Sequence, residues 1–279
     1  MLRISVVIAG IGAVALAGCG LFPDLSALSD AGVDAAHDSE PDVVTDSGAD
    51  AGADVTTDSG DAATCSCTNL VSAYRFSDPN NLGHDYFGNN NFTTVHGTPK
   101  QSTTVPQGHS GYSIQLDGSS TVCIDTGFTF DSTSDHTLCW WSQPAALANS
   151  TNQFAQECSY DTWTTNSGAD YLWRINNCNS GTPANLDVPN VYSIGNWTQI
   201  CQTYTKSSMT RAVVVNGQTS QKFSITDTVP IVENTGNWCI GSYGTGGFWT
   251  GLIYLPMWFN RVLTDAEIQQ VYSTACCLP

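Results

Sequence analysis

The amino-acid sequence predicts an all-β protein whose main domain is an antiparallel two-sheet β-sandwich with one short C-terminal helix. Three observations lead to this prediction. Short runs of alternating apolar and polar residues recur through residues 65–279, separated by Gly, Asn, Asp and Ser. Residues 196–217 carry the strongest hairpin signal in the chain. A helix pattern is convincing only near the C-terminus, so the layers must be built mainly from strands.

The hairpin signal consists of two strand-like segments and a tight turn. Apolar residues alternate through residues 197–204, and both faces of that segment are partly apolar, which suits a strand in the middle of a sandwich sheet. Residues 212–215 form a β-branched run. Asn216-Gly217 follows it, and because both residues tolerate positive φ, the pair predicts a two-residue hairpin turn.

The helix signal begins at Thr264-Asp-Ala-Glu267. Threonine followed three residues later by Glu is a capping box, in which each side chain accepts a hydrogen bond from the other residue's backbone amide. The apolar residues Ile268 and Val271 follow, so this segment is expected to pack one face against the sandwich.

An ordered set of motifs resembles laminin-G-like, concanavalin A-like jelly-roll domains over about residues 70 to 273. The motifs are Leu70-Val-Ser-Ala-Tyr-Arg-Phe76, Asp85-Tyr-Phe-Gly-Asn-Asn-Asn91, Ile114-Gln-Leu-Asp-Gly118, Thr137-Leu-Cys-Trp-Trp141, Asn196-Trp197 with its hairpin, and the segment from Gly251 through Ile268. The resemblance implies a jelly roll. It does not choose a function, because this fold hosts binding modules, lectins and glycosidases.

The first residues resemble a bacterial lipoprotein signal. A basic start and the apolar segment 4–16 lead into Leu16-Ala-Gly-Cys19, which is similar to a lipobox. Residues 1–18 are therefore predicted to be a signal peptide, and Cys19 is predicted to carry the lipid anchor. By analogy, Gly20 argues against retention in the inner membrane. The expected location is the bacterial outer membrane, with periplasm-facing or surface display left open.

Residues 19–64 are predicted to form a disordered acidic tether between the lipid and the domain at 65–279. Positions 20–64 hold ten Asp, one Glu and no Lys or Arg, and the small filler residues cannot bury enough apolar area to fold. The tether accounts for much of the net charge of −17. Because no basic cluster occurs anywhere, nucleic acid is not an expected partner.

Ten cysteines remain apart from Cys19, and an even number in an exported chain predicts disulfides. No Cys-x-x-Cys pair occurs, which argues against zinc. Segments 153–160 and 171–177 are predicted to pair around Asn166-Ser-Gly168. Cys158 and Cys178 are nearly equidistant from that turn, so we expect them to be bonded.

The other eight cysteines are assigned with less support from local pattern. The resemblance, which brings the chain ends together, implies that Cys65 and Cys67 meet Cys276 and Cys277. The remaining four would form two inter-strand bridges, for which we choose Cys123–Cys239 and Cys139–Cys201 among the possible pairings.

The resemblance also raises the question of calcium. Asp85 matches a Ca²⁺ ligand of related domains, but Tyr254 stands where those domains have a second Asp. Since Ca²⁺ prefers hard oxygen anions, we interpret Asp85 as a turn-forming residue and keep Ca²⁺ as the alternative. No cofactor is expected to be required.

Two tryptophans lie in settings typical of ligand contact. Trp163 precedes the turn that contains Asn166, and Trp249 ends the Gly-rich segment that starts at Tyr243. Aromatic rings beside such loops can stack on a sugar, while Asn offers hydrogen bonds. We predict Trp163, Asn166, Tyr243 and Trp249 as the ligand-binding set, against the alternative that both tryptophans only cover the sandwich edge.

Catalysis is not expected. A glycosidase needs two carboxylates at the scissile bond, and the domain has only three Glu. Glu267 is used by the helix cap, and Glu157 with Asp161 is better explained as strand-end charge. The sequence thus predicts a membrane-anchored, non-catalytic binding module for glycans or surface proteins. A divergent carbohydrate-active hydrolase and a structural envelope component are the alternatives.

Overall fold

The structure is a computed structural model that describes residues 68–124, 131–156, 160–175, 184–232, 237–242 and 246–274. All of these residues belong to one compact unit. The predicted signal peptide, Cys19 and the tether lie outside the described residues. Within those ranges, no helix is both long enough and apolar enough to cross a bilayer.

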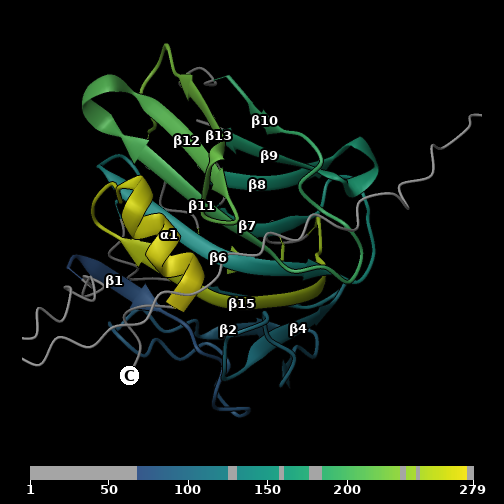
Figure 1. Ribbon diagram of the computed structural model, residues 1–279. Coiled ribbons are helices and arrows are strands. Elements are labelled where there is room, and N and C mark those ends of the chain that lie inside the picture. Colours follow the sequence, from purple (N-terminus) through teal and green to yellow (C-terminus); the bar gives the residue numbers. More distant parts are fainter. Residues whose placement is uncertain are drawn as a thin grey trace, which may run out of the picture. The chain divides into compact units, whose positions relative to one another are not determined.

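The described residues form a sandwich of two antiparallel sheets, as the sequence predicts (Figure 1). The larger sheet has the order β13 (Gln218–Thr226), β12 (Thr210–Val215), β11 (Thr198–Thr205), β6 (His136–Pro144), β15 (Thr250–Phe259), β4 (Ser113–Asp117) and β3 (Lys100–Ser102), and β1 (Leu70–Ala73) also pairs with β15. The smaller sheet has the order β10 (Leu186–Val188), β9 (Asp170–Ile175), β8 (Tyr160–Thr165), β7 (Asn152–Gln156), β14 (Trp238–Ile240), β5 (Thr121–Ile124) and β2 (Thr94–His96).

The main core lies between the sheets and is rich in aromatic rings. Trp140, Phe154, Tyr160, Trp173 and Trp258 are all fully buried there. Their rings meet at tilted or edge-to-face angles, with the centroids of Trp140 and Phe154 4.7 Å apart. Each aromatic pair of this kind contributes about 0.5–1.5 kcal/mol beyond its buried area.

A buried ion pair also ties the two sheets together. Arg211 of β12 donates two 2.7 Å hydrogen bonds to Asp227, and both side chains are fully buried. The same guanidinium donates to the carbonyl of Trp173, in β9 of the smaller sheet. Because the bidentate geometry and the extra acceptors leave no charge unpaired, this pair can be buried without breaking the core.

The helix α1 (Asp265–Thr274) lies across the outer face of the larger sheet (Figure 1). The capping box is confirmed: the amide of Thr264 donates to Glu267 over 2.8 Å, and the amide of Glu267 donates to Thr264 Oγ1 over 3.3 Å. Ile268 and Val271 pack on a second apolar cluster that includes Trp141, so α1 covers part of this face.

The predicted hairpin at residues 196–217 is confirmed, but the one at residues 153–177 is only half right. β11 and β12 pair in register, and β13 follows directly after Asn216-Gly217. A turn does begin at Asn166, where η1 (Asn166–Gly168) joins β8 to β9. Residues 153–160, however, do not form one strand: they are divided between β7 and β8, which pair with each other. The sequence pattern missed this second reversal.

Candidate functional site

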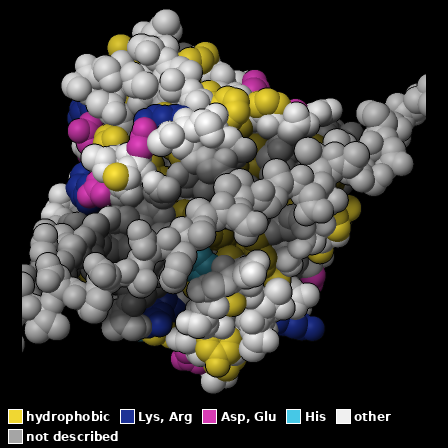
Figure 2. All heavy atoms as spheres, viewed as in Figure 1, with side chains coloured by type: hydrophobic (Ala, Val, Ile, Leu, Met, Phe, Trp, Pro, Cys, Tyr) yellow, Lys and Arg dark blue, Asp and Glu magenta, His cyan; other side chains and the backbone are white. Residues whose placement is uncertain are grey.

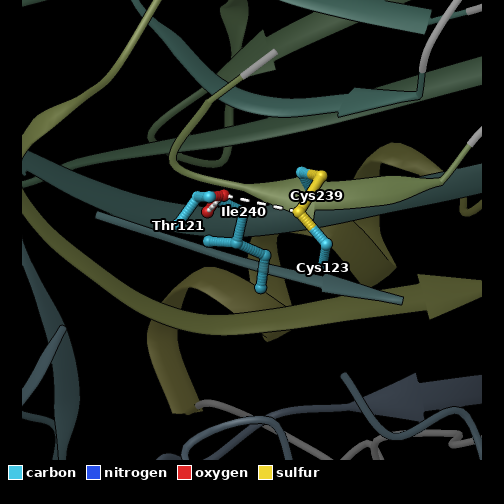
Figure 3. Close-up of a disulfide and its surroundings, with 4 residues drawn as sticks. All are labelled: Thr121, Cys123, Cys239 and Ile240. Atoms are coloured by element: carbon cyan, nitrogen blue, oxygen red, sulfur yellow. Dashed lines mark hydrogen bonds between the residues drawn. A yellow bond between two sulfur atoms is a disulfide. The ribbon is translucent and has the colours of Figure 1, made fainter. Parts of the chain in front are cut away.

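Both central disulfides chosen from the sequence are formed. Cys139 stands directly opposite Cys201 in the larger sheet. Cys123 stands opposite Cys239 in the smaller sheet, between β5 and β14. Figure 3 shows the second bond beside Thr121, whose hydroxyl donates to the carbonyl of Ile240 over 2.8 Å. The predicted bonds of Cys158, Cys178, Cys65, Cys67, Cys276 and Cys277 fall outside the described residues.

The outer face of the smaller sheet carries a cluster that we call the Trp163 site, which consists of Asn152, Asp161, Trp163 and Arg174. Alternation places them on one face, because their neighbours Tyr160, Tyr171 and Trp173 point into the core. Pairing places them side by side: Trp163 is opposite Asn152, and Asp161 is opposite Arg174. A bulge in β7 between Asn152 and Ala155 brings Asn152 into this row.

Polar atoms of this site have no hydrogen-bond partner among the described residues. They are both side-chain polar atoms of Asn152 and Nε of Arg174. The Asp161 carboxylate faces only the Trp163 indole N–H and the Arg174 guanidinium, neither of which makes a well-formed hydrogen bond to it. Asn152 and Asp161 are fully buried, whereas 34% of the Arg174 side chain is exposed. Native proteins pair nearly all such atoms, so a concentration of unpaired ones needs an explanation.

Electrostatics hold the site together more than hydrogen bonds do. An Arg174 nitrogen lies 3.4 Å from an Asp161 oxygen, and the guanidinium lies 5.1 Å from the centre of the Trp163 ring, in a cation–π contact. Burial raises the pKa of the Asp161 carboxyl to about 6, although the Trp163 indole N–H and Arg174 oppose the rise. Asp161 therefore changes charge close to neutral pH.

The structure does not assemble the four predicted ligand-binding residues into one site. Trp163 is partly exposed on the outer face, but Trp249 is only 1% exposed. The backbone N–H of Trp249 donates to Gly241 over 2.8 Å, and its ring turns inward to lie 5.6 Å from that of Tyr192. Trp249 is thus a core residue, and its interpretation as a stacking platform was wrong. Its Gly-rich setting reflects a tight chain path, not exposure.

The other two residues contribute less. Asn166 is exposed, with φ of 49°, and its carbonyl accepts the amide of Ala169, so its backbone forms the turn after β8. Tyr243 lies outside the described residues. Sequence reasoning missed Asn152 and Arg174 as partners of Trp163. The alternation in β9 could have placed Arg174 outward, but the bulge that aligns Asn152 has no clear signal in the sequence.

Asp85 has the geometry of a turn-forming residue. Its carboxylate accepts the backbone amides of Ala73, Phe87 and Asn90 over 2.9–3.1 Å. Gly88 has no room for a side chain, because a Cβ there would lie 2.3 Å from a backbone oxygen. Among the described residues, no three His, Cys, Asp or Glu side chains gather as metal ligands. Calcium at Asp85 stays a prediction.

Residues 116–269 match the Laminin_G_3 family, described as the concanavalin A-like lectin/glucanases superfamily. The chain belongs to this family. No curated protein sequence matches it.

Solved structures share the Laminin_G_3 architecture. One is domain 4 of AbnA, an extracellular GH43 arabinanase from Geobacillus stearothermophilus, in complex with arabinotriose: TM-score 0.58, 18% identity, 73% of this chain and 98% of that chain. Another is the binding domain of Paraclostridial Mosquitocidal Protein 1, with a TM-score of 0.56 and 14% identity. The match covers 74% of this chain and 52% of that chain. A third is the binding domain of Botulinum Neurotoxin DC in complex with SialylT, with a TM-score of 0.54 and 11% identity. The match covers 74% of this chain and 51% of that chain.

The chain spans about half the length of the two toxin chains. At these identities the likeness shows the fold alone.

Proposed function

We propose that this Laminin_G_3 domain is a non-catalytic glycan-binding module and that its ligand occupies the Trp163 site. The observation that carries the proposal is the concentration of unpaired polar atoms around Trp163. A buried polar group without a partner costs about 1–3 kcal/mol. The fold bears that cost at several atoms on one face, and a ligand that pairs with them would offset it.

A sugar has the matching chemistry. Its hydroxyl groups donate to the Asp161 carboxylate and accept from Arg174 Nε, and the Asn152 amide can do both. Its apolar C–H face packs on an indole, and the Trp163 ring is partly exposed. The arabinotriose complex of the arabinanase domain supports a saccharide ligand for this fold.

The proposal is tested by a glycan array, followed by titration calorimetry on the full chain with the best ligand. We expect Trp163→Ala to weaken binding by about five-fold or more, because removing a binding hot spot costs over about 1 kcal/mol. Phe87→Ala is the matched control, since Phe87 is an aromatic residue that is 49% exposed outside the site. Unchanged affinity in a folded Trp163→Ala variant would contradict the assignment.

Membrane anchoring is the second half of the proposal. It is supported by Leu16-Ala-Gly-Cys19 after an apolar segment, and it places the domain at the outer membrane, on the periplasmic or the surface side. Cys19→Ala should move the protein from the membrane fraction to the soluble fraction. If the variant remains in detergent-extracted membranes, lipid on Cys19 is not the anchor.

One observation favours a hydrolase as the rival function. A carboxyl whose pKa is about 6 resembles the general acid of glycosidases, and Asp187 of β10 lies on the same face, opposite Leu172. Release of reducing ends from the array ligand distinguishes the two functions. A binding module releases none. Hydrolysis that Asp161→Asn abolishes would replace the binding-module proposal.

A further inference from the structure

A second candidate site lies on the outer face of the larger sheet, at the end of α1, where two hollows meet at His109. The first hollow has a volume of about 410 Å³ and is lined by Arg75, Tyr112 and Thr274. The second has a volume of about 530 Å³ and is lined by Asn196, Trp197 and Tyr272. His109 lines both, so the two hollows adjoin there, and we call them together the Arg75 groove. Each volume falls within the roughly 300–1,000 Å³ of ligand pockets.

His109 is fixed in place between the two hollows. Its ring lies 5.0 Å from that of Trp141 and 5.6 Å from that of Tyr254. Its Nε2 is 3.2 Å from the carbonyl oxygen of Tyr272, near the end of α1. Figure 2 shows a histidine side chain (cyan) on this side of the molecule, next to hydrophobic side chains. Burial lowers the pKa of His109, so the ring is neutral at physiological pH.

Arg75 gives the groove its charge. Among the residues that the structure describes, no carboxylate lines either hollow. Four other cations of the described residues form ion pairs, namely Arg174, Arg211, Lys222 and Arg261, whereas Arg75 forms none there and only lies 5.9 Å from the ring of Tyr86. The C-terminal end of α1 adds a partial negative charge near Thr274. Arg75 carries a full positive charge, so it outweighs this partial charge in the first hollow.

The second hollow offers apolar walls and amides instead of charge. Trp197 is partly exposed and Tyr272 is 39% exposed. Gln199 stands opposite Trp141 and two residues from Trp197, hence on the same face. It is fully buried, and neither its Oε1 nor its Nε2 has a hydrogen-bond partner within the described part of the chain. Gln199 lies beside the lining and is not part of it, so the polar contacts of this hollow come from Gln107 and Asn196.

We infer that the Arg75 groove binds an acidic oligosaccharide. Its carboxylate or sulfate pairs with the Arg75 guanidinium in the first hollow, where a planar cation suits an oxyanion. The adjoining sugar ring lies in the second hollow, where Trp197 and Tyr272 pack against its C–H face and amides meet its hydroxyl groups. The ligand differs from that of the Trp163 site, where Asp161 and Asp187 disfavour an anion.

The test is titration calorimetry on the full chain with three probes of equal length: an oligogalacturonate, a sulfated galacto-oligosaccharide and the neutral galacto-oligosaccharide. We expect at least one acidic probe to bind at least ten-fold more tightly than the neutral one, and added salt to weaken it. The two acidic probes show whether carboxylate or sulfate is preferred.

Variants locate the site. Arg75→Gln should weaken the acidic probe by ten-fold or more, and Arg75→Lys should keep part of the affinity. Trp197→Ala should weaken it by about five-fold. Lys206→Gln is the control, because it removes the same charge outside the groove. Thermal melting checks that each variant folds.

Two results would overturn the inference: equal binding of neutral and acidic probes, or unchanged binding in Arg75→Gln. If Trp163→Ala abolishes binding of the acidic probe and Arg75→Gln does not, the acidic ligand belongs to the Trp163 site and the Arg75 groove is rejected. If Arg75→Gln abolishes binding of the acidic probe and Trp163→Ala does not, the Arg75 groove is supported, whatever the glycan array shows for the Trp163 site.

Discussion

The two outer faces of the sandwich are built alike and completed differently. Among the described residues, each face carries one disulfide between directly opposed strand residues, Cys139–Cys201 on the larger sheet and Cys123–Cys239 on the smaller. Under α1, the larger sheet is completed by apolar packing that includes Ile268. On the smaller sheet, the Trp163 site instead keeps a buried carboxylate and unpaired amides. Packing under the helix serves stability, whereas the unpaired polar atoms of the Trp163 site do not, and we therefore connect that site with ligand binding.

The largest expected effect tests what the faces share. Replacing both cysteines of either disulfide by Ala should lower the free energy of unfolding by about 4–5 kcal/mol, the loop-closure value for spans of 62 and 116 residues. Chemical denaturation of each double variant measures it. A loss in only one of the two would show that the faces are not equally dependent on their disulfides.

The next effect is specific to the larger sheet. Ile268 lies on the buried side of α1 and is 1% exposed. Ile268→Ala should therefore lower the free energy of unfolding by about 3–4 kcal/mol, through lost burial and a cavity. Gln269→Ala, on the exposed side of the same helix, is the control and should change stability little. Equal melting temperatures for the two variants would mean that the helix contributes little to this face.

A pH-dependent effect is specific to the smaller sheet. The folded pKa of Asp161 is about 6 against an ordinary 3.8, so the folded state binds the proton more tightly and ionisation destabilises it. Stability is lost as pH rises from about 4 to 6. Asp161→Asn should therefore match the wild type near pH 4 and be more stable by up to about 3 kcal/mol at pH 8. A stability difference that does not change with pH would contradict the burial argument.

The smallest effect concerns the start of α1. Thr264→Ala removes the acceptor for the Glu267 amide and should lower the free energy of unfolding by about 1 kcal/mol. Ser273→Ala, an exposed hydroxyl in the last turn, is the control. Equal melting temperatures for the two variants would mean that the capping box contributes little, and that burial of Leu263 and Ile268 stabilises the start of the helix instead.

Local sequence patterns predicted the fold well because each of them depends only on residues that are close together in the sequence. The turn at Asn216-Gly217, the capping box at Thr264 and the alternation in β11 all need only short windows. The prediction of the binding residues failed where exposure and neighbours depend on the pairing of strands that are far apart in the sequence. Trp249 looked exposed by its Gly-rich neighbours, yet the pairing around it turns its ring inward. The grouping of Asp161, Trp163 and Arg174 with Asn152 depends on strand order and one bulge, which no short window contains.

The two disulfides are nested in sequence, and this sets a condition on oxidative folding. Of the four cysteines in these bonds, a chain that enters an oxidising compartment from its N-terminus presents Cys123 first, then Cys139, Cys201 and Cys239. Cys139 and Cys201 are consecutive among these four and form the native bond within the larger sheet, but bonding Cys123 to Cys139, or Cys201 to Cys239, would join residues of different sheets. Cys123 must therefore wait until Cys239 arrives, or exchange an early partner for it through thiolate attack. In the second case the native pairing needs disulfide exchange as well as oxidation.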